Sequence, residues 1–375
     1  MFGNLKLGFG CMRLPITEPD NFKAVDIAQV ERMVDEFIAR GFTYFDTAYM
    51  YHDFESERIM RETLVKRHPR TAYTLTTKLP VMMIHSDEDQ RRIFDEQLEK
   101  CGVDYFDYYL LHSINLKTYS RAKRLDSFGF IAEKRAEGKV RHIGLSFHDT
   151  ADLLDEILTL HPEMEFVQLQ INYLDWENES IQSRKCYEVA RKHNKPIIVM
   201  EPVKGGTLAK VTPEAEALMR GYHPDRSIAS WAIRYVASLE GIEMVLSGMS
   251  NYEQLDDNTS YMRHFEPLND DERAIIDKTV EMLNAAIPIQ CTACRYCVKG
   301  CPKHIAIPEY FNLYNANKQS LNHLFSTQQF YYDTYTTRHG RASDCIACRK
   351  CESVCPQHLP IVEHLKRVSQ MFDKR

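Results

Sequence analysis

The sequence lacks several features that would place it in particular classes of protein. No apolar run reaches the roughly 18 residues needed to cross a membrane, and the first residues lack the charged-then-apolar layout of a signal peptide. A formal net charge of −6 over 375 residues gives no electrostatic footprint for nucleic acid. The pair Gly8 and Gly10 is followed by no third glycine, so it is not a dinucleotide fingerprint. We therefore expect a cytoplasmic protein that binds neither membrane nor nucleic acid.

Cysteine, in contrast, is abundant and regularly spaced. Eight of the 11 cysteines form two runs of the pattern C-x2-C-x2-C-x3-C-P. Three thiolates separated by two residues can hold one face of an iron–sulfur cube, and the fourth, turned away by its proline, ligates the cluster of the other run. The spacing predicts two 4Fe–4S clusters, one held by Cys291, Cys294, Cys297 and Cys355, and the other by Cys345, Cys348, Cys351 and Cys301.

Two other uses of these cysteines are less consistent with the pattern. Four-cysteine zinc sites usually show two separated C-x2-C pairs, without a third cysteine and a Cys-Pro end. A disulfide framework requires a secreted context, which the sequence does not indicate. Abundant thiols without an export signal instead indicate a reducing compartment.

Ahead of the cysteine runs, short apolar segments alternate with amphipathic helices. The periodicity predicts strands at 5–10, 42–46, 72–77, 105–111, 140–146, 165–171, 196–200 and 243–247. Helices are expected from Ile27, behind a capping box of Asp26 and Gln29 and ending at Gly41, and at 56–66, 91–101, 151–160, 179–193, 225–238 and 252–260. Segments 113–130 and 203–224 are expected to be loops that select the substrate.

This alternation predicts an α/β fold, a (β/α)8 TIM barrel over residues 1–262. An open doubly wound sheet is the alternative. Residues 263–375 are expected to contain one connecting helix and then a small α-helical ferredoxin-like domain. Because no Gly/Ser linker joins the two parts, this domain should pack against the barrel.

Polar side chains follow several of the predicted strands at their C-terminal ends, where barrel active sites form. They are Asp46, Lys78, His112, Ser146 and Asn172, with Tyr51 in the loop after the second strand. Singly, each has an ordinary structural explanation, such as a helix cap or a packing aromatic. Together at one edge of a closed barrel, they predict a catalytic site.

These segments resemble the aldo-keto reductase family. The resemblance rests on GFTYFDTAYMYHDFESER, on the lysine of TTKLP, on the histidine of YYLLHS, and on GKVRHIGLS, QLQIN and SGMSNYEQLDDN, in the order of the family. It covers about residues 5–260, and with the cysteine runs the chain is similar to the branch that carries a C-terminal iron–sulfur dicluster domain.

The resemblance implies a set of functional residues. It places the catalytic tetrad on Asp46, Tyr51, Lys78 and His112, and contacts to a nicotinamide cofactor on Ser146, Gln168, Asn172, Gly248, Gln254 and Asn258. Three positions depart from the family pattern: Phe147 replaces an asparagine, Met200 a stacking tyrosine, and Ser250 with Asn251 the basic residues aimed at a 2′-phosphate. The choice between NADH and NADPH therefore stays open.

The chemistry of the tetrad agrees with carbonyl reduction. A free tyrosine, with a pKa of about 10, is too weak an acid at neutral pH. A lysine ammonium beside Tyr51 would lower that pKa, Asp46 would hold the lysine, and His112 would hydrogen-bond to the substrate oxygen.

Three functions are consistent with the sequence. The first is an NAD(P)H-dependent oxidoreductase that interconverts a small carbonyl and an alcohol. The second is an electron-transfer oxidoreductase in which a ferredoxin or flavoprotein partner, or a bound flavin, links the clusters to the barrel. The third is a regulatory or binding subunit. A nicotinamide moves two electrons together and a cube accepts one, so we favour clusters that are not required for NAD(P)H-driven turnover.

Overall fold

The computed structural model describes residues 5–19, 21–285, 287–319 and 326–373. Eight parallel strands form a closed barrel in sequence order, with β8 paired to β1. The strands are β1 (Leu7–Gly10), β2 (Tyr44–Asp46), β3 (Thr74–Leu79), β4 (Phe106–Ile114), β5 (Val140–Phe147), β6 (Phe166–Gln170), β7 (Ile197–Met200) and β8 (Ile242–Ser247). The predicted barrel is therefore confirmed, and the open sheet is excluded.

Helices surround the barrel, as the periodicity predicted. They are α1 (Ile27–Ala39), α2 (Ser56–Met60), α3 (Asp87–Cys101), α4 (Leu116–Arg124), α5 (Ser127–Ala136), α6 (Ala151–Leu160), α7 (Ser183–Lys192), α8 (Pro213–Tyr222), α9 (Ile228–Ala237) and α10 (Tyr252–Met262). At α1 the carboxylate of Asp26 accepts from the Gln29 backbone, but the Gln29 amide returns to that carboxylate and not to the Asp26 backbone. The predicted capping box is thus only half formed.

The two segments expected to be loops are largely helical. Within 113–130, α4 begins at Leu116 behind the cap Asn115, whose side chain accepts from the backbone N–H of Lys117 and Thr118. Within 203–224, α8 begins at the cap Thr212 with Pro213 in its first turn. Side-chain caps at both starts explain why these polar segments form helices.

Apolar side chains fill the barrel on both sides of the sheet. Inside it lies a cluster of Tyr44, Tyr108, Leu110, Phe166, Ile198, Met244 and Leu246. A β-carbon at Gly8 would lie 2.8 Å from Leu246, so glycine is needed at this inward position. A larger cluster packs the outer face against the helices.

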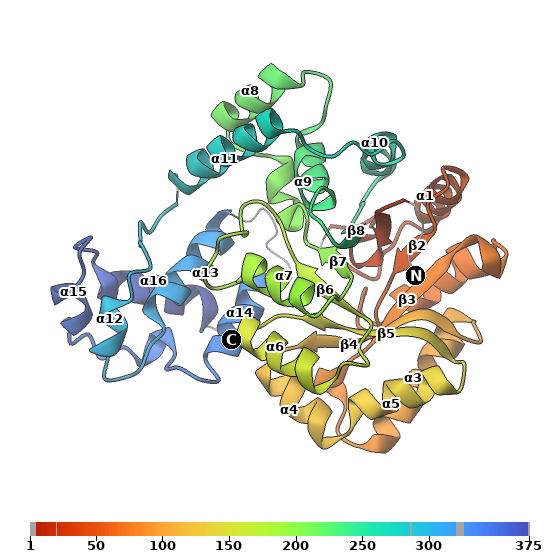
Figure 1. Cartoon of the computed structure of the whole chain (residues 1–375), viewed down its shortest axis with the longest axis horizontal. Helices are drawn as coiled ribbons and strands as arrows, with labels where there is room; N and C mark the ends of the chain where they lie inside the picture. The colour runs from red at the N-terminus through yellow and green to blue at the C-terminus, as the bar shows by residue number, and fades with distance from the viewer. Residues whose placement is uncertain (1–4, 20, 286, 320–325, 374–375) are drawn as a thin grey trace.

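The C-terminal part of the described chain adds six helices, of which the last five form the blue group beside the barrel in Figure 1. The six are α11 (Asp270–Ala285), α12 (Tyr296–Lys299), α13 (Ile307–Gln319), α14 (Thr327–Tyr335), α15 (Lys350–Ser353) and α16 (Ile361–Phe372). Ile276 of α11 belongs to an apolar cluster with Trp231 of α9, so the expected boundary at 262/263 falls between two helices that both lie against the barrel. In Figure 1, α14 lies between the other blue helices and the barrel.

Aromatic residues between the cysteine runs mainly build the core of this C-terminal domain. Tyr310, Phe311, Tyr314, Tyr331 and Tyr332 are buried. Phe325 lies outside the described residues. Stacked and tilted ring contacts join Tyr332 to Phe372 and to Tyr310. A small helical core therefore accounts for most of these aromatics.

Candidate active site and cluster domain

Three of the four predicted catalytic side chains form one hydrogen-bonded chain at the barrel mouth. Lys78, near the end of β3, donates from Nζ to Asp46 Oδ1 at 2.6 Å and to the Thr47 carbonyl at 2.8 Å. The same Nζ lies 3.4 Å from the Tyr51 hydroxyl. Lys78 and Asp46 are almost completely buried. Neighbouring parallel strands thus bring the carboxylate, the ammonium and the phenol into line.

Burial and charge act in opposite directions on this chain. Burial lowers the pKa of Lys78, but attraction from Asp46 and from Tyr51 outweighs it, so the net pKa is raised and the ammonium form is kept. Burial raises the pKa of Tyr51, while the charge of Lys78 opposes that rise only in part. The expected lowering by lysine is therefore present, but in the free protein desolvation is stronger and the phenol holds its proton.

His112 faces the same site from β4. That strand runs to Ile114, three residues beyond its predicted end, because it continues to pair with Phe147 of β5 past a register shift. The rings of His112 and Tyr51 meet edge-on at 6.0 Å. Burial, then the charges of Lys78 and His148, hold the pKa of His112 well below its usual value, so its imidazole is neutral at pH 7. Its buried Nδ1 has no hydrogen-bond partner within the described residues.

The turn that carries Tyr51 is held by a residue that sequence reasoning missed. His52, Asp53 and Phe54 all have positive φ, at 51°, 51° and 74°. His52 Nε2 accepts from the Leu14 backbone at 3.2 Å, so its Nδ1 carries the proton and donates to the Phe22 carbonyl at 2.8 Å. These bonds to the segment after β1 fix a turn that costs backbone strain. No local pattern marks His52, because both partners are distant in sequence.

The cofactor candidates on β5 and β6 are buried and engaged with neighbouring groups. Ser146 Oγ accepts from the Ser113 backbone at 2.7 Å, and Gln168 Nε2 lies 3.4 Å from Asp46 Oδ2. Asn172 donates to Asp175 at 2.9 Å and to a backbone carbonyl at 3.3 Å, and accepts from the Asp175 backbone at 2.8 Å. Gln168 thus joins the buried chain of Asp46 and Lys78, whereas Asn172 is tied to the neighbouring buried pair of Asp175 and Lys204.

The candidates after β8 lie at the rim of the mouth. Gln254 is exposed, and its side chain accepts from the Ser250 backbone at 2.8 Å. Asn258 is buried and donates to Ser247 at 2.9 Å. Gly248 lies against Arg13, since a β-carbon there would stand 3.1 Å from that side chain. Arg13 pairs with Glu201 at 3.5 Å, and its backbone carbonyl accepts from the Ser250 hydroxyl at 3.0 Å.

The eight cysteines of the two runs line two separate hollows. Cys291, Cys294, Cys297 and Cys355 line the first, together with Ile307, Phe311, Leu359 and Ile361. Cys301, Cys345, Cys348 and Cys351 line the second, together with Ile305, Val362 and Leu365. Each hollow thus takes three thiols from one run and the fourth from the other.

The backbone repeats as closely as the spacing does. Ala293, Arg295 and His304 have φ of 53°, 64° and 52°, and Ala347, Arg349 and His358, at the same offsets in the second run, have 55°, 57° and 50°. These left-handed residues curl each run around its hollow. No group of three or more Cys, His, Asp or Glu is placed to hold a single metal ion among the residues that the structure describes. The four thiolates of a 4Fe–4S cube lie farther apart than the ligands of a single ion. The lack of a single-ion site among the described residues therefore does not test for clusters.

The remaining cysteines are packing residues. Cys11, Cys101 and Cys186 are buried, and burial raises the pKa of each thiol above its ordinary value. Within the described parts of the chain, no helix is both long and apolar enough to span a membrane.

Comparisons with known proteins agree with this geometry. Residues 6–281 match the model of the aldo/keto reductase family, and residues 290–359 match that of a 4Fe–4S dicluster domain. An oxidoreductase of Schizosaccharomyces pombe is 27% identical over 68% of this chain and 80% of its own length. Aldo-keto reductase str7 of Strobilurus tenacellus is 30% identical over 54% of this chain and 59% of its own length.

Solved structures show the same barrel. Aldo-keto reductase AKR11C1 of Bacillus halodurans aligns with a TM-score of 0.58 and 22% identity over 74% of this chain and 95% of its own. An aldo-keto reductase of Klebsiella pneumoniae, solved with NADPH, aligns with a TM-score of 0.55 and 18% identity over 73% and 90%. With a family match over most of its length and a second match at the cysteine runs, the chain belongs to the aldo/keto reductase family and carries a C-terminal 4Fe–4S dicluster domain.

Proposed function

We propose that the barrel interconverts a small carbonyl compound and its alcohol by nicotinamide hydride transfer, with Tyr51 as the proton donor. The observation that carries this proposal is the buried chain from Asp46 through Lys78 to the Tyr51 hydroxyl. Reduction of a carbonyl creates an alkoxide, and the phenol can donate its proton while Lys78 stabilises the phenolate that remains. Neutral His112, beside the Tyr51 ring, can hydrogen-bond to the substrate oxygen.

A nicotinamide cofactor would lie across the mouth from β6 to α10. When bound, NAD(P)H supplies the hydride. Gln168, Ser146 and Asn172 would line its nicotinamide end, and Gly248, Gln254 and Asn258 its phosphate and adenosine end. Exposed Gln254 at the start of α10 fits this role, because the N-terminus of that 11-residue helix favours anionic groups. The fold-related Klebsiella pneumoniae protein was solved with NADPH.

We assign the two hollows to 4Fe–4S clusters, with the eight cysteines as ligands in the exchanged arrangement given above. Apolar neighbours such as Phe311 and Leu365 would shield the clusters from water. Ligation would stabilise a domain too small to hold itself by its core alone. A second function is supported by the exposure of Cys294 and Cys348, which would let a ferredoxin or flavoprotein exchange single electrons with the clusters.

Replacing Tyr51 with Phe tests the enzymatic proposal. The variant keeps the ring beside His112 but removes the hydroxyl, so kcat for carbonyl reduction should fall at least about a hundredfold while the affinity for NAD(P)H is kept. Tyr49→Phe is a matched control, because that hydroxyl in the same turn donates to Glu96 outside the site. Near-wild-type turnover by Tyr51→Phe, measured anoxically, would remove Tyr51 from the role of proton donor.

A further inference from the structure

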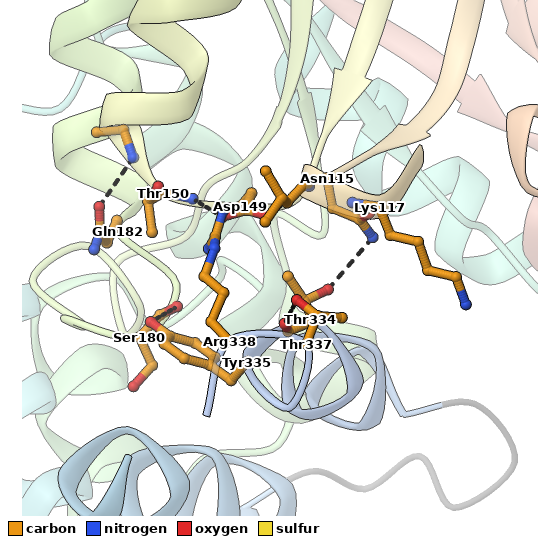
Figure 2. A network of polar contacts seen from close by, with 12 residues as sticks. Asn115, Lys117, Asp149, Thr150, Ser180, Gln182, Thr334, Tyr335, Thr337 and Arg338 are labelled. Atoms are coloured by element: carbon orange, nitrogen blue, oxygen red, sulfur yellow. Dashed lines mark hydrogen bonds and ion pairs between the residues drawn. The ribbon is translucent and has the colours of Figure 1, made fainter. Parts of the chain in front are cut away.

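The dicluster domain contacts the barrel at the loops that follow β4, β5 and β6 (Figure 2). The candidate catalytic residues Asp46, Lys78 and His112 lie in the C-terminal parts of β2, β3 and β4, at the same edge of the barrel. Asn115, after β4, donates to Thr334 of α14 at 3.4 Å. Asp149, after β5, pairs with Arg338 at 2.8 Å. The hydroxyl of Tyr335 donates to the backbone carbonyl of Ser180, after β6, at 3.2 Å. Helix α14 and the turn after it therefore contact three consecutive loops of the catalytic mouth.

Asp149 connects these loops to one another. Its side chain is 1% exposed and accepts from the Leu116 backbone at 2.9 Å and the Thr150 backbone at 2.7 Å, besides its pair with Arg338. Leu116 follows β4, and Thr150 precedes α6, so one buried carboxylate ties two loops together. A buried carboxylate is costly without a counter-charge, and here the dicluster domain supplies it.

His148, in the loop after β5, contacts both helix α14 and the end of the strand that carries His112. Its ring meets Phe330 edge-on at 5.2 Å and Tyr331 at 6.0 Å, both in α14. Its backbone donates to the Ile114 carbonyl at 2.9 Å, two residues beyond His112. His148 therefore stands where β5 ends, beside the end of β4, the strand that carries His112. Tyr331 is 3% exposed and anchors the helix, whereas Phe330 is half-buried.

We propose that Phe330 of the dicluster domain forms, with His148, the side wall of the catalytic mouth beside His112 and limits the size of the substituent on the carbonyl substrate. Arg338 is the positioning residue that holds the loops carrying this wall. The inference rests on the proposed carbonyl reduction and extends it, because it makes the second domain part of the substrate site. The substrate class it implies is a carbonyl compound with a small apolar substituent that packs against an aromatic ring.

Phe330→Ala tests the wall through substrate size. We would compare kcat/KM for propanal and 2-naphthaldehyde in the anoxic, cluster-loaded protein. Shortening Phe330 opens the mouth, so the ratio for naphthaldehyde over propanal should rise at least about fivefold, with cofactor affinity unchanged. Leu160→Ala, a substitution at a 58% exposed position in α6, is the control that should leave the ratio unchanged. If this ratio stayed the same or fell in Phe330→Ala, Phe330 would not limit the size of the substrate.

A second measurement does not depend on turnover. Diethylpyrocarbonate reacts with accessible neutral imidazoles, and mass spectrometry locates the product. His148 should react several-fold faster in Phe330→Ala than in the wild type or in Leu160→Ala. An unchanged rate would show that Phe330 does not shield His148. If the wild type reduced neither aldehyde, the proposed function would fail, and this rate would still decide the inference.

Arg338 is tested by amide hydrogen exchange. Peptides covering the amides of Leu116 and Thr150 should exchange faster in Arg338→Ala, because Asp149 would lose its counter-charge. Arg338→Lys should recover part of the protection, since it restores charge without the planar fork. If the substitution only destabilised the fold, amide exchange would increase to a similar extent throughout the dicluster domain. Unchanged exchange of these peptides in Arg338→Ala would contradict the positioning role.

Discussion

Replacing Lys78 with Met should destabilise the barrel strongly, and the structure gives the reason. Asp46 is 3% exposed, and Lys78 Nζ lies 2.6 Å from its carboxylate. Methionine fills the apolar part of the lysine side chain but leaves the carboxylate buried without its cation. Breaking a buried pair from one side costs about 3–5 kcal/mol, whereas Gln168, whose Nε2 lies 3.4 Å from the other carboxylate oxygen, is a weak replacement.

The free energy of unfolding of Lys78→Met should also depend on pH, in a direction that the pKa of Asp46 determines. In Lys78→Met the pKa of Asp46 should rise above the value of about 3.9 that the unfolded chain has. The folded variant then binds more protons than the unfolded chain, so its free energy of unfolding should fall as pH rises from about 4 through that raised pKa. In the wild type burial already raises the pKa of Asp46, but Lys78 opposes that rise, so the same loss should be smaller there.

Urea unfolding followed by circular dichroism, between pH 5 and pH 8, measures both effects. The double variant Asp46→Asn with Lys78→Met removes the stranded charge and should recover about half or more of the lost stability, without the pH dependence. The reasoning is refuted if Lys78→Met loses less than about 1 kcal/mol at pH 8, or if the double variant is no more stable than the single one.

Four further outcomes are expected. Dissociation constants for NADH and NADPH should differ by less than about tenfold, because Ser250 offers a neutral group where a phosphate dianion favours Arg or Lys; a hundredfold tighter NADPH complex would show that a basic residue has taken over. Cys355→Ser and Cys294→Ser should alter the same electron paramagnetic resonance signal, because both cysteines line one hollow. Cys348→Ser should alter the other signal. If Cys355→Ser instead matched Cys348→Ser, the exchange of the fourth cysteine between the two runs would be contradicted. Burial lowers the pKa of His148 to about 4, so between pH 7 and pH 5 the unfolded chain protonates this histidine and the folded chain does not. The free energy of unfolding should therefore fall by up to about 2 kcal/mol over that range. If a His148→Asn variant lost as much, the loss would come from another group. Rates of NAD(P)H-dependent carbonyl reduction should be equal with oxidised and with reduced clusters, and a severalfold difference would favour electron traffic to the barrel.

The barrel could be predicted because its strands are short apolar runs separated by amphipathic helices. The same pattern drew attention to residues such as Asp46 and Lys78, which fall where neighbouring strands end, whereas the choice of four catalytic candidates came from the family resemblance. The prediction of loops at α4 and α8 is wrong, because both segments are rich in polar residues and their starts depend on caps at Asn115 and Thr212. Polar composition therefore concealed helices that a side-chain cap initiates.

Long-range contacts account for most of what the sequence could not show at the site. Arg338 and Asp149 are separated by 189 positions, and neither lies in a motif. His52 contacts Leu14 and Phe22, both of which follow the first strand. Such pairs are chosen by how distant segments pack, and a single sequence has no local signal for that packing.

If the proposed wall and the Arg338 contact act as inferred, the dicluster domain would influence catalysis without passing an electron to the barrel. The Tyr332 hydroxyl of α14 accepts from the Ala342 backbone at 2.8 Å, three residues ahead of Cys345, and it donates to Asp373 at 2.9 Å beyond α16. The second cysteine run, α14 and the last helix are thus one packed unit. Cluster ligation by the cysteines would hold this unit together and, through it, would keep Arg338 against Asp149. A loss of activity after removal of a cluster would then report a displaced loop as readily as a broken electron path, which is why the comparison of oxidised with reduced clusters in the folded protein separates the two roles.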